Sequence, residues 1–555
     1  MVGRILSALE GSVPTLHGAA YVLGGAAVAS QILAFFRDRL LAHLFGAGSA
    51  LDVYYAAFRI QDFIFLSVAS LVSLSVLLPF VIDREKEGVG ELRAFVGRVV
   101  SFFGILVAFS CAVAYFLVPI LLPLLFGGLF GRGYDEEFIE LSRLLLLSPF
   151  LLGLSSVFAS ITQAKRRFYL YALSPLVYNL GIIGGIIFLA PVHGILGVGY
   201  GVIIGAFLHL LIQVPSIMRD RLLPIPTLFF SAAEFLAIAR LSVPRTAALT
   251  LNHLVLLALT MLAARSTEGS VSVLNLAINL QSVPLAIVGA SYSLAAFPTL
   301  ARHFSLGEID AFLLKTIVAL RHILFWALPI SVLFIVLRAQ IVRVVLGTGA
   351  FDWVDTRLTA AALALFAVSI LCQSISLLLI RAYYAASFTK KPLSAGLLQA
   401  LVTVSSAFLL GHLFSVSVFF RDFLESLLRV EGLPGTDILI LPLAFSIGSI
   451  AGTLALLLMF RRDFPGGEGL LPSFFLNLSG AVIAGFACYQ FLEIFTVWVP
   501  TDTVFGLFAQ GLFSGILGLM VGAAVLSLLN SRELREVMSS LQNRVWKTEA
   551  VQVGE

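Results

Sequence analysis

The sequence has few charged residues for its length. Asp, Glu, Lys and Arg together make up 12% of the 555 residues, whereas 59% of the residues are hydrophobic. A soluble protein of this size needs far more polar surface to cover its core. The composition therefore excludes a soluble globular protein and predicts one whose surface largely faces lipid.

Cysteine is also scarce, and the motifs of enzymes are missing. Cys111, Cys372 and Cys488 all lie inside apolar runs, with neither disulfide nor metal-ligand spacing, so we interpret them as small buried apolar side chains. There is no Walker loop, HExxH, GxSxG or GxGxxG after a strand. The sequence thus predicts no enzyme, no ATP-driven pump and no cofactor.

Long apolar runs recur along most of the chain, and each is long enough to cross a hydrocarbon layer of about 30 Å as a helix. Helices are expected because lipid offers no partner to open backbone groups. We therefore predict an all-α polytopic membrane protein with about fourteen spans. The spans are placed at residues 17–43, 50–82, 94–126, 138–162, 167–190, 194–216, 234–264, 269–301, 312–346, 357–384, 391–417, 437–460, 470–495 and 503–529.

Basic residues concentrate in every second loop, for example at Lys165 to Arg167, Lys390–Lys391 and Arg461–Arg462. Because cytoplasmic loops carry the excess of Lys and Arg, both termini are predicted to be cytoplasmic. The net charge of +4 lies in these short loops, which argues for membrane orientation and against nucleic-acid binding. The first residues form a short cytoplasmic lead-in, not a signal peptide.

An internal repeat divides the chain. Residues 48–79 resemble residues 269–298, and the basic run before Pro175 resembles a second basic run just before Pro392. We predict a first six-helix lobe over residues 1–225, a second over 226–465, two further helices over 466–530, and an amphipathic cytoplasmic tail over 531–555. Parallel repeats of this kind place a substrate site between the halves, near the bilayer midplane.

Charged side chains inside predicted spans are the sharpest functional signal, since each costs about 2.5–3.5 kcal/mol at a span centre. The first two spans hold Arg37, Asp38, Asp52, Arg59 and Asp62. The last three lie roughly along one helical face, which predicts a cavity-lining stripe. Arg37 and Asp38 instead could neutralise each other or reach the interface.

The second half contributes Arg245, Asn252, Asn279 and Gln281 to the predicted substrate site. Asn and Gln equally suit hydrogen bonds that join neighbouring helices. His253 is a candidate for ion or proton coupling, although a helix-packing role fits it as well.

Several segments resemble the MurJ (MviN) proteins, the lipid II flippases of the multidrug/oligosaccharidyl-lipid/polysaccharide exporter superfamily. The likeness rests on residues 33–40, 45–52 and 55–60, and is supported by Pro244–Arg245, residues 277–281 and 296–300. It implies two lobes plus two helices, and a cavity whose cations hold a polyprenyl pyrophosphate. It also implies that Arg37 and Asp38 match the family's cavity pair. Gln31, Phe65 and Asn279 stand where the family has basic residues, and Leu259 where it has an acidic one.

We therefore expect a flippase that moves lipid II from the inner to the outer leaflet by alternating access, driven by membrane potential or by Na⁺ or H⁺. It would reside in the bacterial cytoplasmic membrane, work as a monomer, contact membrane lipids and serve cell-wall synthesis enzymes. The alternatives are export of another lipid-linked oligosaccharide, drug or cation antiport, and a non-transporting envelope scaffold.

Overall fold

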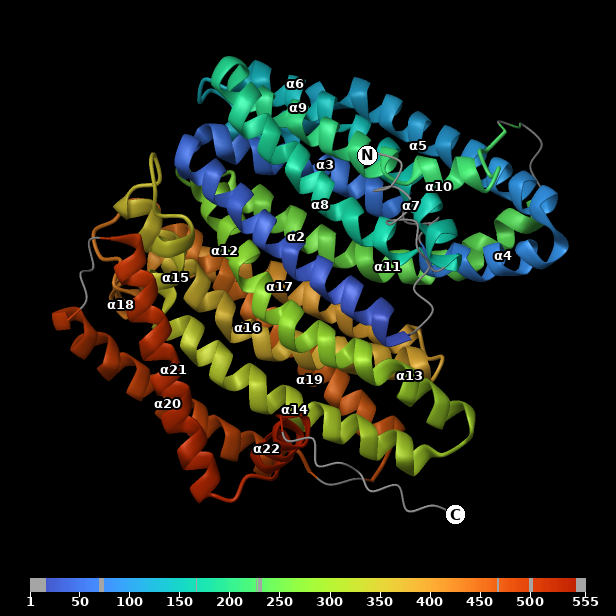
Figure 1. Ribbon diagram of the computed structural model, residues 1–555. Coiled ribbons are helices and arrows are strands. Elements are labelled where there is room, and N and C mark those ends of the chain that lie inside the picture. The colour runs from blue at the N-terminus through green and yellow to red at the C-terminus, as the bar shows by residue number, and fades with distance from the viewer. Residues whose placement is uncertain are drawn as a thin grey trace, which may run out of the picture. The chain divides into compact units, whose positions relative to one another are not determined.

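The computed structural model describes residues 16–68, 74–165, 167–225, 227, 232–466, 469–498 and 503–545. These described ranges contain α-helices with short 3₁₀ and π segments and no β-strand. The predicted all-α architecture is confirmed, and Figure 1 shows its helices. The chain forms two compact units. Unit 1 comprises residues 1–276, 345–355 and 432–441, and unit 2 comprises residues 277–344, 356–431 and 442–555.

Unit 1 contains the helices of the first six predicted spans. It also contains the first helices of the second predicted lobe, up to residue 276. Its helices are α2 (Leu16–Phe45), α3 (Ser49–Ser67), α4 (Leu74–Glu87), α5 (Val89–Phe126), α6 (Asp135–Leu145), α7 (Leu147–Ala164), α8 (Phe168–Gly184), α9 (Ala190–Leu211), α10 (Val214–Arg219), α11 (Ala232–Ala263) and the first half of α12 (Ser270–Pro284).

Unit 2 holds the end of α12 and most of the remaining helices. They are α13 (Ser291–Ser305), α14 (Ile309–Val336), α15 (Arg338–Val345), α16 (Trp353–Ala385), α17 (Lys390–Val416), α18 (Val418–Leu428), α19 (Ile440–Asp463), α20 (Leu471–Trp498), α21 (Val504–Leu528) and α22 (Arg532–Val545). The lobe boundaries predicted at residues 225 and 465 stay a prediction.

Within the described residues, ten helical segments are long and apolar enough to cross a membrane. One of them, Tyr169–Arg219, contains two of the predicted spans and is broken at Gly194, whose φ of 55° is not helical. The helices α2, α3 with α4, and α11 lie at the other predicted spans. The chain is a multi-pass membrane protein, and the count of fourteen spans stays a prediction.

Glycines allow α8 and α9 to pack unusually closely in unit 1, where the two helices lie side by side (Figure 1). A Cβ added at Gly181 would lie 2.3 Å from the Cα of Gly205, and one at Gly185 would lie 2.4 Å from the Cα of Gly201. Small residues favour such approach between membrane helices because association there depends on close packing. This contact helps to fix α8, which carries a polar residue of the site described below.

Each unit also contains an ion pair that joins its fifth and sixth predicted spans at one end. In unit 1, Arg167 donates to both carboxylate oxygens of Asp220, each at 2.9 Å. In unit 2, Lys391 donates to Asp463 at 3.1 Å, and the Tyr383 hydroxyl donates to the same carboxylate at 3.0 Å. The repeat noted in the sequence thus places comparable ion pairs in both units.

The described part of the C-terminal tail is the amphipathic helix α22, which packs on α14 and α21. Leu534 is buried against Phe325 and Leu526, and the buried Glu533 accepts a hydrogen bond of 2.6 Å from Ser473. Part of the apolar face of this amphipathic helix therefore contacts protein.

The packing of α8 against α9 predicts different effects for two adjacent glycines. Gly185→Ala should lower the melting temperature of the detergent-solubilised protein, because the new methyl group meets the backbone of α9, and overpacking costs about 1–3 kcal/mol. Gly184→Ala is the matched control, since nothing lies within 4 Å of its added Cβ. Equal melting temperatures for both variants would contradict the close approach of α8 and α9.

Candidate functional site

Arg37 on α2 is held by two neighbours. Its Nε and Nη2 donate to the same oxygen of Asp38 at 2.9 and 2.7 Å, and its Nη1 donates to Asn179 on α8 at 3.2 Å. The Asp38 side chain is 4% exposed, whereas that of Arg37 is 21% exposed. Asp38 thus neutralises Arg37 at one edge of the guanidinium, and part of the group remains accessible.

Tyrosines surround this pair. Tyr54 and Tyr55 on α3 and Tyr178 on α8 all lie within electrostatic range of Arg37. The Tyr55 hydroxyl is buried and has no hydrogen-bond partner among the described residues. A buried hydroxyl without a hydrogen-bond partner costs free energy. The Tyr55 hydroxyl is therefore a donor that a bound group near Arg37 could use.

Arg59 lies further along α3 and contacts two other helices of unit 1. Its Nε donates to the Thr260 hydroxyl on α11 at 2.9 Å, and its Nη2 donates to the side-chain amide oxygen of Asn275 on α12. Both acceptors are neutral, so they orient the guanidinium without cancelling its charge. Asp62, one turn along α3, acts on Arg59 electrostatically and accepts a weak hydrogen bond of 3.5 Å from Gln61.

Tyr55 lies four positions before Arg59 on α3, so the two share one face of this helix, and Tyr54 and Tyr55 both lie within electrostatic range of Arg37. We call the whole set the polar cluster. Its members are Arg37, Asp38, Tyr54, Tyr55, Arg59, Asp62, Tyr178 and Asn179.

Three further predicted site residues lie on α11. His253 is half-buried and within electrostatic range of Arg59. Asn252 is exposed. The side chain of Arg245 lies outside the described residues, so its predicted place in the site stays a prediction.

Asp52 on α3 is fully buried and accepts three hydrogen bonds from the start of α12. They come from the backbone N–H groups of Gly269 and Ser272, both at 2.8 Å, and from the Ser272 hydroxyl at 2.7 Å. Arg132 adds a guanidinium nitrogen at 3.6 Å. A carboxylate is well placed there because a helix N-terminus presents free N–H groups and partial positive charge. Asp52 therefore joins α3 to α12 in this structure.

Two more carboxylates hold the start of α3 in the same way. Glu268 accepts a hydrogen bond of 2.9 Å from the Ser49 N–H, and Asp355 accepts one of 2.9 Å from the Ala47 N–H. We call the contacts of Asp52, Glu268 and Asp355 with these backbone groups the loop latch. Within unit 1 it joins the α2–α3 loop to segments that come from the second half of the sequence.

The Glu268 contact of the loop latch is suited to neutral pH. The hydrogen bond from the Ser49 N–H is the largest cause that lowers the pKa of Glu268, which lies in the loop between α11 and α12. A carboxylate with a lowered pKa stabilises the fold above its unfolded pKa, and this stabilisation is lost as the pH falls through the folded-state pKa. The Glu268 contact should therefore persist at physiological pH.

Asn279 and Gln281 belong to unit 2. Gln281 is buried, and its amide donates to the Ser369 hydroxyl on α16 at 2.7 Å, which is the helix-joining role that the sequence also allowed. Asn279 is half-buried on the same helix.

Sequence reasoning missed Asn179, Thr260 and Asn275 as partners of the two arginines, Arg132 as a partner of Asp52, and Glu268 as part of the loop latch. Single polar residues within apolar spans were the available signal for the first three. Arg132 lies in a loop just before Asp135, Glu136 and Glu137, so its neighbours in the sequence did not point to a contact with the distant Asp52.

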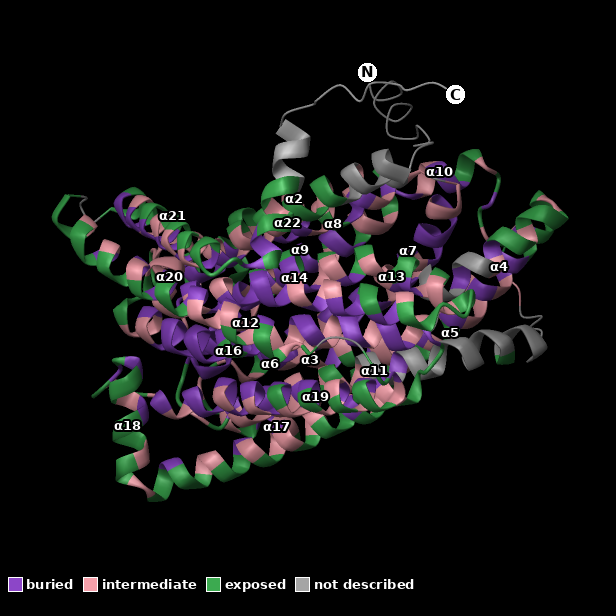
Figure 2. Ribbon diagram, turned by 90° about the horizontal axis from the view of Figure 1, so that it is seen from below, coloured by how far each residue is buried: buried purple, intermediate pink, exposed green. Residues whose placement is uncertain are grey.

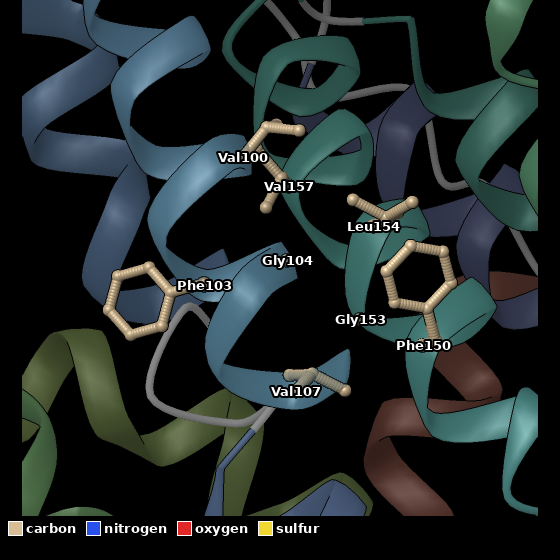
Figure 3. A pocket seen from close by; sticks show the side chains of 8 residues that line it. All are labelled: Val100, Phe103, Gly104, Val107, Phe150, Gly153, Leu154 and Val157. Atoms are coloured by element: carbon tan, nitrogen blue, oxygen red, sulfur yellow. The ribbon is translucent and has the colours of Figure 1, made fainter. Parts of the chain in front are cut away.

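An apolar pocket in unit 1 has a different character from the polar cluster. Figure 3 shows its lining side chains, which come from α5 and α7. They are Val100, Phe103, Gly104, Val107, Phe150, Gly153, Leu154 and Val157. A pocket without a polar side chain cannot hold an anionic group. The described residues also contain no cluster of His, Cys, Asp and Glu that could hold a metal ion.

Comparison with known proteins identifies relatives over most of the chain. The family model described as "Lipid II flippase MurJ" matches residues 41–509. A probable lipid II flippase MurJ of Thermotoga maritima is 29% identical over 467 residues, which cover 82% of this chain and 92% of that protein. The corresponding protein of Haemophilus influenzae is 28% identical, with 66% of this chain and 76% of that protein covered.

Solved structures give the same fold. A lipid II flippase MurJ in an inward closed conformation matches with a TM-score of 0.70 and 21% identity, covering 93% of this chain and 99% of the other. An inward-facing multidrug resistance transporter of the MATE family matches with a TM-score of 0.62 and 13% identity, covering 78% and 94%. At these identities the structural likeness concerns the fold alone. Since the family model covers most of its length, the chain belongs to the lipid II flippase MurJ family.

Proposed function

We propose that this protein translocates lipid II, the undecaprenyl-pyrophosphate-linked peptidoglycan precursor, from the inner to the outer leaflet of the membrane. The observation that carries the proposal is the pair of arginines, Arg37 and Arg59, which α2 and α3 hold in one polar cluster in a chain of this family. The protein is then a transporter and not an enzyme. The MATE likeness is one of fold, and nothing in the polar cluster favours a cationic drug.

The polar cluster suits an anionic head group. A pyrophosphate carries several acceptor oxygens, and guanidinium groups bind such oxygens in charge-assisted pairs. The two hydrogen-bond acceptors of Arg59, Thr260 and Asn275, are neutral and orient its guanidinium. The Tyr55 hydroxyl supplies a further donor. Substrate therefore enters a site whose donors are already oriented.

Asp38 has a different role in this proposal. It neutralises Arg37 when no substrate is bound, at a distance of 2.7 Å, and the pyrophosphate competes with it for the guanidinium. This exchange avoids leaving a buried charge without a partner, which would be strongly unfavourable. Asp62 plays the same part for Arg59 at longer range. We retain Arg245, Asn252 and Asn279 as proposed substrate contacts, whereas Gln281 fits better as a tie to α16.

Translocation requires that the substrate site opens to one side of the membrane at a time. In this proposal the loop latch closes the outer side while the head group enters from the cytoplasm. Most of its hydrogen bonds come from backbone N–H groups, and the Ser272 hydroxyl also donates to Asp52. Alternating access then consists of breaking and re-forming these bonds.

The remaining assignments follow the charge pattern of the sequence. We place the protein in the bacterial cytoplasmic membrane with both termini in the cytoplasm, acting as a monomer alongside cell-wall synthesis enzymes. Membrane potential or a Na⁺ or H⁺ gradient drives the cycle, with His253 as the candidate coupling residue beside Arg59.

Removing the two arginines tests the proposed site. The wild-type chain should restore growth to a bacterium depleted of its lipid II flippase, and Arg37→Ala or Arg59→Ala should abolish this rescue. Each loss of a charge-assisted hydrogen bond costs about 1.5–3 kcal/mol, so lipid II binding in native mass spectrometry should weaken by roughly tenfold or more.

Arg143→Ala is the matched control, because Arg143 lies over the Tyr115 ring and donates to the Tyr115 carbonyl, outside the polar cluster. It should rescue growth like the wild type. Full rescue by the Arg37→Ala, Arg59→Ala double variant would remove both residues from the mechanism.

Weakening the loop latch should expose the start of α12. Ser270 is 3% exposed, so Ser270→Cys in a chain without other cysteines should react slowly with a membrane-impermeant maleimide. Adding Asp52→Asn should raise the labelling rate several-fold, since the amide cannot accept from all three donors of α12 and also pair with Arg132.

Asp135→Asn serves as the control for this measurement. Asp135 accepts a 2.8 Å hydrogen bond from the Gly131 N–H within its own loop, so the substitution changes a similar contact that joins no distant segments. If both substitutions raise the labelling rate equally, or neither does, the loop latch does not hold this side closed.

A further inference from the structure

The short helix α18 has an apolar surface that the protein covers only in part. Phe420, Leu424 and Leu428 recur at every fourth position, and Leu424 and Leu428 are buried. Positions spaced in this way share one face of a helix. This face holds α18 against the protein.

A second apolar stripe on α18 lies beside the first and is exposed. Phe419, Phe423 and Leu427 also follow every fourth position, with 82%, 55% and 61% of their surface exposed. The rings of Phe419 and Phe423 stack with a centroid distance of 6.5 Å. Arg421, Asp422 and Glu425 occupy the remaining arc, so the helix has a polar side opposite an apolar side that is too wide for the protein to cover.

The exposed stripe continues a surface that faces lipid. α17 is a candidate membrane span whose residues are mostly exposed, and Leu409, Leu413 and Val416 are exposed at its end. Only Ser417 separates α17 from α18, and its extended backbone turns the chain (Figure 2). Its hydroxyl accepts a hydrogen bond from the Phe420 N–H and so caps the new helix.

Other features of unit 2 mark the same membrane level. α17 and α20 cross the membrane in the same direction if successive spans alternate, and α20 ends at Val497 and Trp498, which are 84% and 79% exposed. Tryptophan at the end of a span is typical of the membrane–water interface. The end of α17, where α18 begins, therefore lies at an interface.

We propose that α18 is an interfacial membrane anchor, with Phe419, Phe423 and Leu427 inserted among the lipids of the leaflet where α17 ends and with its charged arc in water. The two-sided pattern, with exposed Phe and Leu on one side and charged residues on the other, fits helices that lie in the interface plane. This assignment depends on the chain being a membrane protein and not on its transport substrate.

Fluorescence quenching by brominated phosphatidylcholine tests the proposal in nanodiscs that hold one copy of the full chain. With Cys111, Cys372 and Cys488 replaced by alanine, a bimane label at Phe423→Cys should be quenched several-fold more strongly than one at Asp422→Cys. It should also emit at shorter wavelength. Weak quenching at both positions would place α18 in water and overturn the proposal.

A label at Phe423→Cys that emits at short wavelength yet is not quenched would mean that protein covers the stripe, which also overturns the proposal.

A second set of variants tests whether the side chains of the native stripe cause the insertion. With the label at Leu427→Cys, the Phe419→Asp, Phe423→Asp pair should abolish quenching. Arg421→Asp changes the net charge by the same amount on the polar arc and should leave quenching intact. Loss of quenching in both would contradict insertion through this stripe.

Discussion

A charged side chain inside an apolar helical bundle must find partners, and the polar cluster depends on how this constraint is met. Arg37 is neutralised by the adjacent Asp38 and held by Asn179, whereas Arg59 is oriented by the neutral acceptors Thr260 and Asn275, with Asp62 acting on it at longer range. The second arrangement is the informative one. Neutral acceptors lower the free-energy cost of burying a guanidinium, but they do not offset its positive charge. An anion that binds there can offset it.

The loop latch uses the same physics at the ends of helices. Carboxylates of Asp52, Glu268 and Asp355 take up backbone N–H groups that a helix start or loop leaves free. Because Asp52 and Arg59 are on one face of α3, and both contact α12, the latch and the polar cluster share two helices. In the proposed cycle, a change at the loop latch would reach the polar cluster through α3 and α12.

Sequence reasoning placed the helices because hydrophobicity over about twenty residues is a local property. It singled out Arg37, Asp38, Asp52, Arg59 and Asp62 because each charge in a predicted span is conspicuous, and their role in a substrate site stays a prediction.

It did not find Asn179, Asn275 or Thr260, since one polar residue in an apolar span does not show which helix it faces. The role of Asp52 was also hidden, because it caps α12 through contacts with Gly269 and Ser272. These residues lie 217 and 220 positions further along the sequence. Arg132 and Glu268 were missed for the same reason. Contacts across such separations follow from the fold, not from local pattern.

The central claim is that this chain carries a pyrophosphate-linked lipid across the bilayer. Its most direct test is a translocation assay with the purified protein in liposomes, using lipid II labelled on its head group and placed in one leaflet, with a membrane-impermeant quencher outside. The account predicts that labelled lipid II becomes distributed over both leaflets, and that protein-free liposomes show no such movement. Retention of lipid II in its original leaflet, in liposomes whose protein still binds it, would contradict the account.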